Sequence, residues 1–279
     1  MLSCSNHLAS LSGDTTLRVL VIGGSGYVGK LILPMLAEQH EVRVFDLAPP
    51  PLGPWKYSAG DVVDLHELEI VSKDTDALVF MAMGSTDDDG TFKSNAATRS
   101  AFDVSVKGLY FALDAARKAG LRHAVYTSSM SIYDGPTTER YTQSEDIAAD
   151  ARDVYGLTKS LGEEVCRFAV RSWQMSVNVL RLCLPVSMEQ WNANDADLSV
   201  ITTSADDVGR ALLAALNYRN GYQDFMISGD RDYTCMDLSK AKRLLHWEPS
   251  ARPTTLRQVR PTTESLARLL SRAKRLRFR

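Results

Sequence analysis

A glycine-rich turn that joins an apolar strand to an amphipathic helix is the feature that most constrains this chain. The apolar run 17–22 precedes the segment GGSGYVG at 23–29, and helical spacing of apolar residues follows. Gly23 permits the sharp exit from the strand, Gly26 lets the backbone approach a pyrophosphate, and Gly29 lets the helix pack closely on the sheet. The helix N-terminus favours phosphate through its free N–H groups and its dipole. The residues expected to contact a dinucleotide here are Gly23, Gly26, Tyr27, Val28 and Gly29.

The rest of the chain alternates between short apolar runs and amphipathic segments with helical spacing. This alternation predicts right-handed β–α–β units and a mostly parallel sheet with helices on both faces. We expect an α/β chain with a doubly wound parallel sheet, the Rossmann fold, and a loop over the proline-rich segment 48–57. The predicted strands are 17–22, 41–45, 77–82, 123–127, 177–182 and 224–227, and the main predicted helices are 27–38, 98–119, 153–173 and 206–218.

An acidic residue follows the second predicted strand. Asp46 comes soon after the glycine turn, and a carboxylate there can accept hydrogen bonds from the adenosine ribose hydroxyls while repelling a 2′-phosphate. Leu47 and Ala48 come next, so no Arg directly follows the acid to hold such a phosphate. Arg43 is a cation that could weaken the preference. The sequence therefore favours NAD over NADP as the cofactor.

A tyrosine and a lysine stand four residues apart in the predicted helix 153–173. Tyr155 and Lys159 form the pattern YxxxK, and positions i and i+4 share one helix face. A free phenol has a pKa of roughly 10, and a nearby ammonium lowers that value by stabilising the phenolate. The phenol can then exchange a proton with a substrate hydroxyl or carbonyl while a hydride moves to or from nicotinamide. Ser129, at the end of a predicted strand, could bind the same substrate oxygen.

Together with these motifs, segments along most of the chain resemble the extended short-chain dehydrogenase/reductase family, the NAD-dependent epimerase/dehydratase group. The resemblance runs from residue 17 to about residue 250 and implies an NAD-dependent oxidoreductase. The segments that carry it are VIGGSGYVG, FDL, GDVVD at 60–64, ALDAARKAGLRHAVYTSSMSIY, YGLTKSLGEE, VLRLCLP, SADDVGRAL and DLSKAKRLLHWEP.

The resemblance also implies roles for individual residues. Ser129 matches the catalytic Ser/Thr, Tyr155 matches the acid/base, and Lys159 also touches the nicotinamide ribose. Ser105 departs from the pattern, because the family usually has a partly structural Asn there. The further cofactor-binding residues implied are Asp61 and Val62, which flank adenine, and Ala82, which lies where a loop passes the cofactor.

The compact layout most resembles the uronate dehydrogenases of that family. Only about 20 residues separate Pro185 from Asp206, where nucleotide-sugar members carry a long insertion, so no nucleotide pocket is expected. Ser85 matches a substrate-binding Ser of the uronate enzymes.

The resemblance to uronate dehydrogenases ends at the substrate. Met130 stands where they have an Asn, and Leu184 stands where they have a Ser. No Arg or Lys occurs from 182 to 209, so the cation that pairs with the uronate carboxylate is missing unless Arg99, Arg140 or a partner subunit supplies one. We expect a small, less polar substrate. The expected substrate residues are Ser85, Ser129, Met130, Tyr155 and Leu184.

Three functions remain open at this point. The first is an NAD-dependent dehydrogenase or reductase of a small alcohol or carbonyl compound, such as a sugar, a polyol or a natural-product intermediate. The second is a sugar epimerase or dehydratase with tightly bound NAD. The third is a non-enzymatic NAD-sensing protein, against which the intact set of Ser129, Tyr155 and Lys159 counts.

Composition limits the partners and the location. The net charge of -2 argues against a protein that binds nucleic acid. The sequence contains no run of 18 or more apolar residues, so no membrane span is predicted. The four cysteines have no metal-ligand spacing, so we expect no metal and a reduced, cytoplasmic setting. A small-molecule substrate is the expected partner.

The chain is expected to divide into three parts and to form a homodimer. Residues 1–16 are predicted to be a disordered leader, 17–185 the NAD-binding domain with the catalytic residues, and 186–279 a small C-terminal substrate-binding portion interleaved with it. Family members often dimerise through the helices at 98–119 and 153–173. The apolar residues that could serve that interface, or face their own sheet, are Phe102, Val106, Val165 and Ala169.

Overall fold

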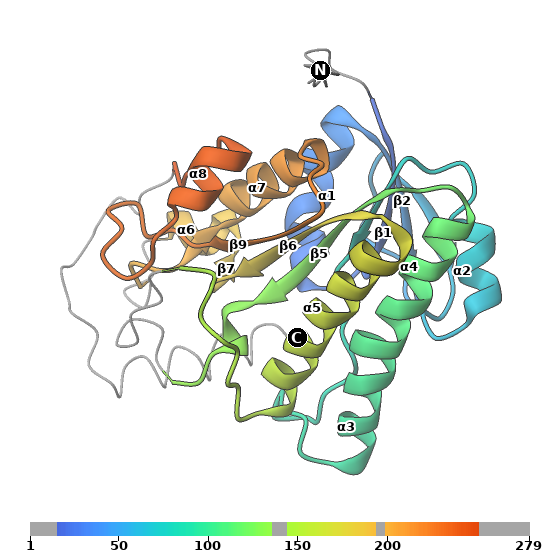
Figure 1. Cartoon of the computed structure of the whole chain (residues 1–279), viewed down its shortest axis with the longest axis horizontal. Helices are drawn as coiled ribbons and strands as arrows, with labels where there is room; N and C mark the ends of the chain where they lie inside the picture. Colours follow the sequence, from blue (N-terminus) through green and yellow to red (C-terminus); the bar gives the residue numbers. More distant parts are fainter. Residues whose placement is uncertain (1–15, 136–143, 194–198, 251–279) are drawn as a thin grey trace, which may run out of the picture.

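A seven-stranded parallel sheet forms the centre of the computed structural model, which describes residues 16–135, 144–193 and 199–250 (Figure 1). The strand order is β3-β2-β1-β4-β5-β6-β9, so the chain first runs outward from β1 and then restarts on its other side at β4. Ligands bind outside the carboxyl ends of the strands at such a reversal. The strands are β1 (Arg18–Ile22), β2 (Glu41–Asp46), β3 (Lys56–Ala59), β4 (Ala77–Phe80), β5 (His123–Ser129), β6 (Ser176–Leu182) and β9 (Tyr222–Ile227), and a separate parallel pair is formed by β7 (Pro185–Val186) and β8 (Thr203–Ser204).

Helices cover both faces of the sheet because alternate residues of the buried strands enter two different cores. Val19 and Val21 of β1 pack into the core beneath α1 and α7, whereas Leu20 and Ile22 pack into the core beneath α2, α4 and α5. All four side chains are at most 1% exposed. The doubly wound fold expected from the sequence is therefore confirmed. The longer α-helices are α1 (Tyr27–Gln39), α3 (Asn95–Phe102), α4 (Leu109–Lys118), α5 (Val154–Trp173) and α7 (Ala205–Asn217), and the shorter ones are α2 (Leu65–Val71), α6 (Met188–Asn192) and α8 (Ser239–Leu245).

The proline-rich segment 48–57 is not loop throughout, which corrects the expectation. Its last two residues begin β3, which pairs in parallel with β2 at the edge of the sheet. The side chains of β3 are largely exposed, so this strand carries no apolar run that would reveal it in the sequence.

The single helix predicted over 98–119 contains a change of helical type. α3 passes into a π-helical segment, Asp103–Gly108, which continues as α4. Ser105, where the family usually has Asn, lies inside this segment and is 1% exposed. π-Helical turns are rare and are found frequently at functional sites.

The predicted division into domains stays a prediction. All but the last residue of the proposed leader 1–16 lie outside the described residues. Residues beyond 185, such as Val208 and Trp247, share one core with Val19 and Val21. Among the described helices, none is both long enough and apolar enough to cross a membrane.

Candidate active site

The glycine turn lies at the carboxyl end of β1 and closely approaches the backbone after β4. Gly23 has φ +85°, and a Cβ there would overlap the backbone of Ala82. A Cβ on Gly29 would overlap the backbone of Gly24, so the first turn of α1 can pack against the strand exit only without a side chain. No side chain caps the N-terminus of α1, whereas serine or aspartate side chains cap α2, α3, α5, α6 and α7. This open end suits a phosphate.

Asp46 lies beside this turn at the end of β2. Its Oδ2 accepts a hydrogen bond from the backbone N–H of Ser25 over 2.9 Å. The guanidinium of Arg43 is directed elsewhere, since its Nη1 donates to the carbonyl oxygen of Val71 over 3.2 Å. Asp46 is therefore positioned to meet a ribose, and the guanidinium of Arg43 does not neutralise its carboxylate.

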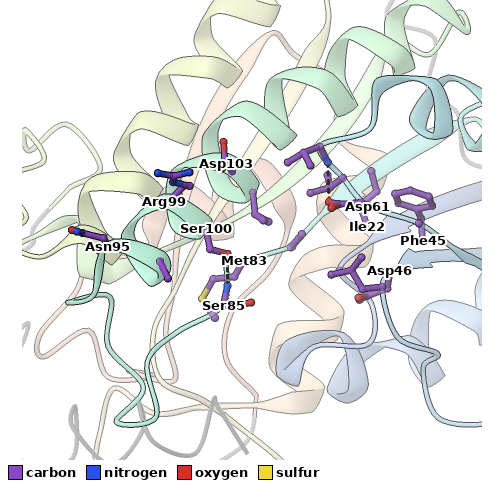
Figure 2. Close-up of a pocket in the computed structure, with 18 residues that line it drawn as sticks. Ile22, Phe45, Asp46, Asp61, Met83, Ser85, Asn95, Arg99, Ser100 and Asp103 are labelled. Atoms are coloured by element: carbon purple, nitrogen blue, oxygen red, sulfur yellow. Dashed lines mark hydrogen bonds between the residues drawn. The ribbon is translucent and has the colours of Figure 1, made fainter.

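A cavity of about 610 Å³ opens along the carboxyl ends of β1, β2 and β4 (Figure 2). Figure 2 places Asp46, Asp61 and Phe45 towards one end and Asn95 and Arg99 towards the other. The cavity holds six of the residues predicted from the sequence. These six are Gly23, Asp46, Asp61, Val62, Ala82 and Ser85.

Two glycines permit close packing in the wall of the cavity. A Cβ on Gly108 would press on the side chain of Val62, and a Cβ on Gly60 would overlap the ring of Phe45. Asp61 is held by its own turn, because its Oδ1 accepts from the backbone N–H of Val63 over 3.1 Å. The rigid, partly apolar wall at this end suits a flat ring such as adenine.

The predicted catalytic residues meet where α5 begins against the end of β5. Lys159 is 4% exposed, and its Nζ donates to the carbonyl oxygen of Thr127 over 2.8 Å. The same Nζ lies 5.8 Å from the ring centroid of Tyr155. A Cβ on Gly156 would overlap the carbonyl oxygen of Ser131, so the helix approaches the residues that follow Ser129 as closely as backbones allow.

Local contacts fix the two groups that would touch a substrate oxygen. The Oγ of Ser129 accepts a hydrogen bond from the backbone N–H of Ser131 over 3.1 Å. The ring of Tyr155 stacks on Phe92, with centroids 6.2 Å apart and an interplanar angle of 1°. Tyr155 is half-buried, so its ring is held while part of it stays accessible.

A buried ionic network stands behind this junction. Glu163, two turns along α5 from Tyr155, accepts from Ser128 Oγ over 2.7 Å and pairs with Arg181 Nη2 over 2.7 Å. Arg181 also bonds Asp224 over 2.8 Å. Burial opposes the charge of Arg181, but Glu163 and Asp224 outweigh it and raise the pKa of the guanidinium. This cation is committed to the network and unavailable to a substrate.

Three groups of predicted site residues lie outside the cavity lining. Met130 and Leu184 are 3% and 7% exposed and belong to the large apolar core, so their role in the substrate site stays a prediction. Tyr27 donates its hydroxyl to Gln190 Oε1 of α6 over 3.1 Å. The remaining predicted residues that do not line the cavity are Gly26, Val28, Gly29, Ser129, Tyr155 and Lys159.

The cavity also includes residues of α3 and of the first position of the π-helical segment, none of which the sequence indicates as cofactor-binding. A stripe at helical spacing, comprising Ala96, Arg99, Ser100 and Asp103, faces it. From the sequence, Arg99 is a candidate only as a cation for a substrate carboxylate. No motif marks this stripe, and its helical spacing alone does not tell which face of α3 turns to the cavity.

Comparisons with known proteins place the chain in a family. The model of the NAD dependent epimerase/dehydratase family matches residues 19–230. The chain is 29% identical over 150 residues to N-acetyl-alpha-D-glucosaminyl-diphospho-ditrans,octacis-undecaprenol 4-epimerase of Escherichia coli O157:H7, covering 54% of this chain and 43% of the relative. It is 32% identical over 167 residues to mouse 3 beta-hydroxysteroid dehydrogenase type 7, covering 54% of this chain and 44% of that protein.

Among solved structures, the uronate dehydrogenase of Agrobacterium tumefaciens is similar in fold. It superposes with a TM-score of 0.71 at 24% identity, covering 85% of each chain. At this identity the likeness supports the fold and not the substrate.

The chain belongs to the NAD-dependent epimerase/dehydratase family, a branch of the extended short-chain dehydrogenases/reductases. Membership confirms the predicted family and the predicted cofactor, NAD. The chain spans about half or less of the length of the curated relatives named above. Within the described residues, no group of His, Cys, Asp or Glu could hold a metal ion.

Proposed function

We propose that this enzyme transfers a hydride between NAD and a small alcohol or carbonyl compound that carries no nucleotide. The observation that supports this most directly is the junction of α5 with β5. It holds the buried ammonium of Lys159 near the ring of Tyr155 and against the carbonyl oxygen of Thr127, two residues before Ser129 at the strand end. A reaction of this kind needs one acid/base, one charge to stabilise its phenolate and one hydroxyl to orient the substrate.

The residues of the chain divide the work of the reaction. In the direction of oxidation, Tyr155 takes the proton from the substrate hydroxyl as the carbonyl forms, and Ser129 hydrogen-bonds the same oxygen. Lys159 stabilises the phenolate through its positive charge. Gly23, with the open N-terminus of α1, would hold the cofactor diphosphate, and Asp46 would hold the adenosine ribose. Bound NAD supplies the acceptor for the hydride that leaves the alcohol carbon.

We infer a substrate of modest polarity. The segment 182–209 has no Arg or Lys, and Arg181 next to it is held by Glu163 and Asp224. A carboxylate buried there would lack a partner, which is costly. The name of the mouse relative, a steroid dehydrogenase, supports an alcohol on a largely apolar skeleton. Deoxy sugars, cyclic alcohols and natural-product intermediates fit this description.

The experiment that tests the proposal is a panel of alcohols and aldehydes assayed with NAD or NADH at 340 nm. The panel contains cyclic alcohols, sterols, deoxy sugars and nucleotide sugars. A net change in NADH with a small alcohol or carbonyl compound supports the proposal. Conversion of a nucleotide sugar with no net change in NADH would instead establish the epimerase alternative, which the bacterial relative's name favours.

We further infer a homodimer formed through α4 and α5. Tyr110 and Phe168 are 38% and 37% exposed, and with Trp173 they form a continuous aromatic cluster with ring centroids 5.1–6.0 Å apart. An exposed aromatic surface on two adjacent helices suits a second copy of the chain. Ala169, one of the residues expected at this interface, is fully buried against its own sheet.

Sedimentation tests the dimer directly. Phe168→Glu is expected to shift the protein from dimer to monomer, whereas Leu52→Glu, on an exposed loop elsewhere, leaves the sedimentation coefficient unchanged. A wild-type monomer at micromolar concentration would contradict the proposal.

We also propose a cytoplasmic location. Cys166 and Cys183 are buried free thiols and Cys235 is a partly exposed free thiol, which fits a reducing compartment.

A further inference from the structure

Arg99 is the one cation among the side chains that line the described cavity. The other charged residues of the lining are the carboxylates of Asp46, Asp61 and Asp103. A dinucleotide brings two negative charges in its diphosphate into this space. The lining residues as a group therefore carry a net negative charge, and the position of Arg99 matters for binding.

Within the described part of the chain, no hydrogen bond or ion pair engages the guanidinium of Arg99. A carboxylate stands one turn further along, at Asp103, where an i,i+4 pair would be natural. Asp103 instead pairs with Lys107, Oδ1 to Nζ, over 3.0 Å. Arg99 thus remains exposed and available to a ligand at the cavity.

Short contacts connect the glycine turn to the helix that carries Arg99. Gly23 approaches the backbone of Ala82, and the backbone N–H of Ser85, three residues later, donates to Ser100 Oγ over 2.8 Å. Ser100 is the neighbour of Arg99 and lines the same cavity. α3 consequently faces the glycine turn across the carboxyl end of β4.

The direction of Arg99 distinguishes it from a substrate ligand. Ala97 and Ala101 of α3 pack in a cluster with Phe92 and Tyr155. Arg99 lies two residues from each alanine, which on an α-helix is about 200° around the axis. Its side chain therefore leaves the opposite face of α3, away from the phenol that would meet the substrate.

We propose that Arg99 binds the diphosphate of the dinucleotide, opposite the open N-terminus of α1. Arg is suited to phosphate because its planar guanidinium can donate two parallel hydrogen bonds. The adenosine 2′ position does not compete for it, because Figure 2 places Asp46 and Arg99 at opposite ends of the cavity. The inference requires NAD as the cofactor and is independent of which substrate is turned over.

Calorimetric titration of the full chain with NAD, ADP-ribose and adenosine tests this assignment. Arg99→Gln is expected to weaken NAD and ADP-ribose by about three- to tenfold, the range between an exposed ion pair and a charge-assisted hydrogen bond. Adenosine, which has no phosphate, keeps its affinity. The loss shrinks in high salt, because exposed charges are screened.

Two further variants make the result decisive. Lys93→Gln removes an exposed charge from the segment just before α3, outside the cavity lining, and should bind all three ligands as the wild type does. Arg99→Lys keeps the charge and should recover part of the loss. Unchanged NAD affinity in Arg99→Gln overturns the proposal, and so does an equal loss for adenosine. None of these titrations uses a substrate. A wrong assignment of Arg99 is therefore distinguishable from a wrong assignment of the reaction.

Discussion

The ammonium nitrogen of Lys159 lies 2.8 Å from the carbonyl oxygen of Thr127, and this hydrogen bond joins the first turns of α5 to the end of β5. Lys159 is 4% exposed, so its charge is removed from water while it stays near the ring of Tyr155. A charge in a water-poor site acts more strongly on its neighbours than an exposed one. The fold thus brings the predicted acid/base and its stabilising charge together at the start of α5.

Removing the Tyr155 hydroxyl should abolish most turnover and leave NAD binding intact. Tyr155→Phe keeps the ring that stacks on Phe92 but removes the group that carries the proton. General acid/base groups contribute about 10²–10⁴-fold to rate. The measurement is kcat on a verified substrate beside calorimetric NAD affinity, with Tyr233→Phe, at an exposed tyrosine outside the cavity lining, as the matched control. Near-normal kcat in Tyr155→Phe would assign the proton transfer to another group.

Replacing Lys159 should impair both catalysis and the cofactor. Lys159→Met keeps the chain length but removes the charge near Tyr155 and a donor to the Thr127 carbonyl. We expect kcat to fall by at least tenfold and NAD to bind several-fold more weakly, by analogy with the loss of a charged hydrogen bond. Circular dichroism controls for folding. A variant that loses turnover at full NAD affinity would limit Lys159 to the proton transfer.

The charge of Asp46 should set the preference for NAD over NADP. Asp46→Asn retains an acceptor for the N–H of Ser25 but removes the negative charge that would repel a 2′-phosphate. We expect the NAD/NADP affinity ratio to fall by about tenfold, mainly because NADP binds better. Arg43 should not contribute, since it donates to Val71, and Arg43→Gln serves as the control. An unchanged ratio in Asp46→Asn would place the discrimination elsewhere.

Most of the sheet could be predicted from sequence because buried parallel strands are apolar throughout. β3 was missed because an edge strand with exposed side chains has no such run. α2 was also missed, although Asp64 caps it by accepting from the N–H groups of His66 and Glu67, a pattern that a search for N-caps could find.

The lining of the cavity was predictable where its residues follow strands, but its residues on α3 carry no motif that marks them. Asp46 is the last residue of β2, and Ala82 follows soon after the end of β4. The carboxyl ends of parallel strands lie along one edge of the sheet, so both residues reach the cavity there. Arg99 lies in mid-helix, and its access to the cavity depends on which face of α3 is turned towards the cavity. Met130 and Leu184 are substrate candidates only through the resemblance to uronate dehydrogenases, which does not indicate how deeply they are buried.

Acid should destabilise the protein through a histidine far from the active site. Burial lowers the pKa of His123 to about 4, and the side chain is fully enclosed, with Nε2 lying 2.9 Å from the carbonyl oxygen of Ala215. The folded-state pKa lies below the unfolded value, so this contribution to stability is present above about pH 6.5 and is lost as the pH falls towards 4. The loss is on the order of 2–3 kcal/mol.

Unfolding free energies measured between pH 7 and 4 test this expectation. His123→Gln should lower stability at pH 7 but flatten the dependence between pH 6.5 and 4. Ala215 keeps a donor in that variant, because Asn178 Nδ2 also donates to its carbonyl oxygen over 2.8 Å. The exposed His66 gives the control His66→Gln, which should follow the wild-type curve. An identical slope in His123→Gln and wild type would contradict the prediction.

Hexuronates should be poor substrates, although the fold resembles that of a uronate dehydrogenase. The segment 182–209 offers no cation, Arg181 is held by Glu163 and Asp224, and Arg99 leaves α3 on the face away from Tyr155. A uronate carboxylate at the reacting end of the site would therefore lose its water without gaining a partner. This cost would raise the free energy of the bound ground state and of the transition state alike. Steady-state assays with glucuronate and galacturonate decide the matter. Efficient NAD-dependent oxidation of either, with kcat/KM of about 10⁴ M⁻¹s⁻¹ or more, would mean that a cation reaches the carboxylate by a route this arrangement does not provide.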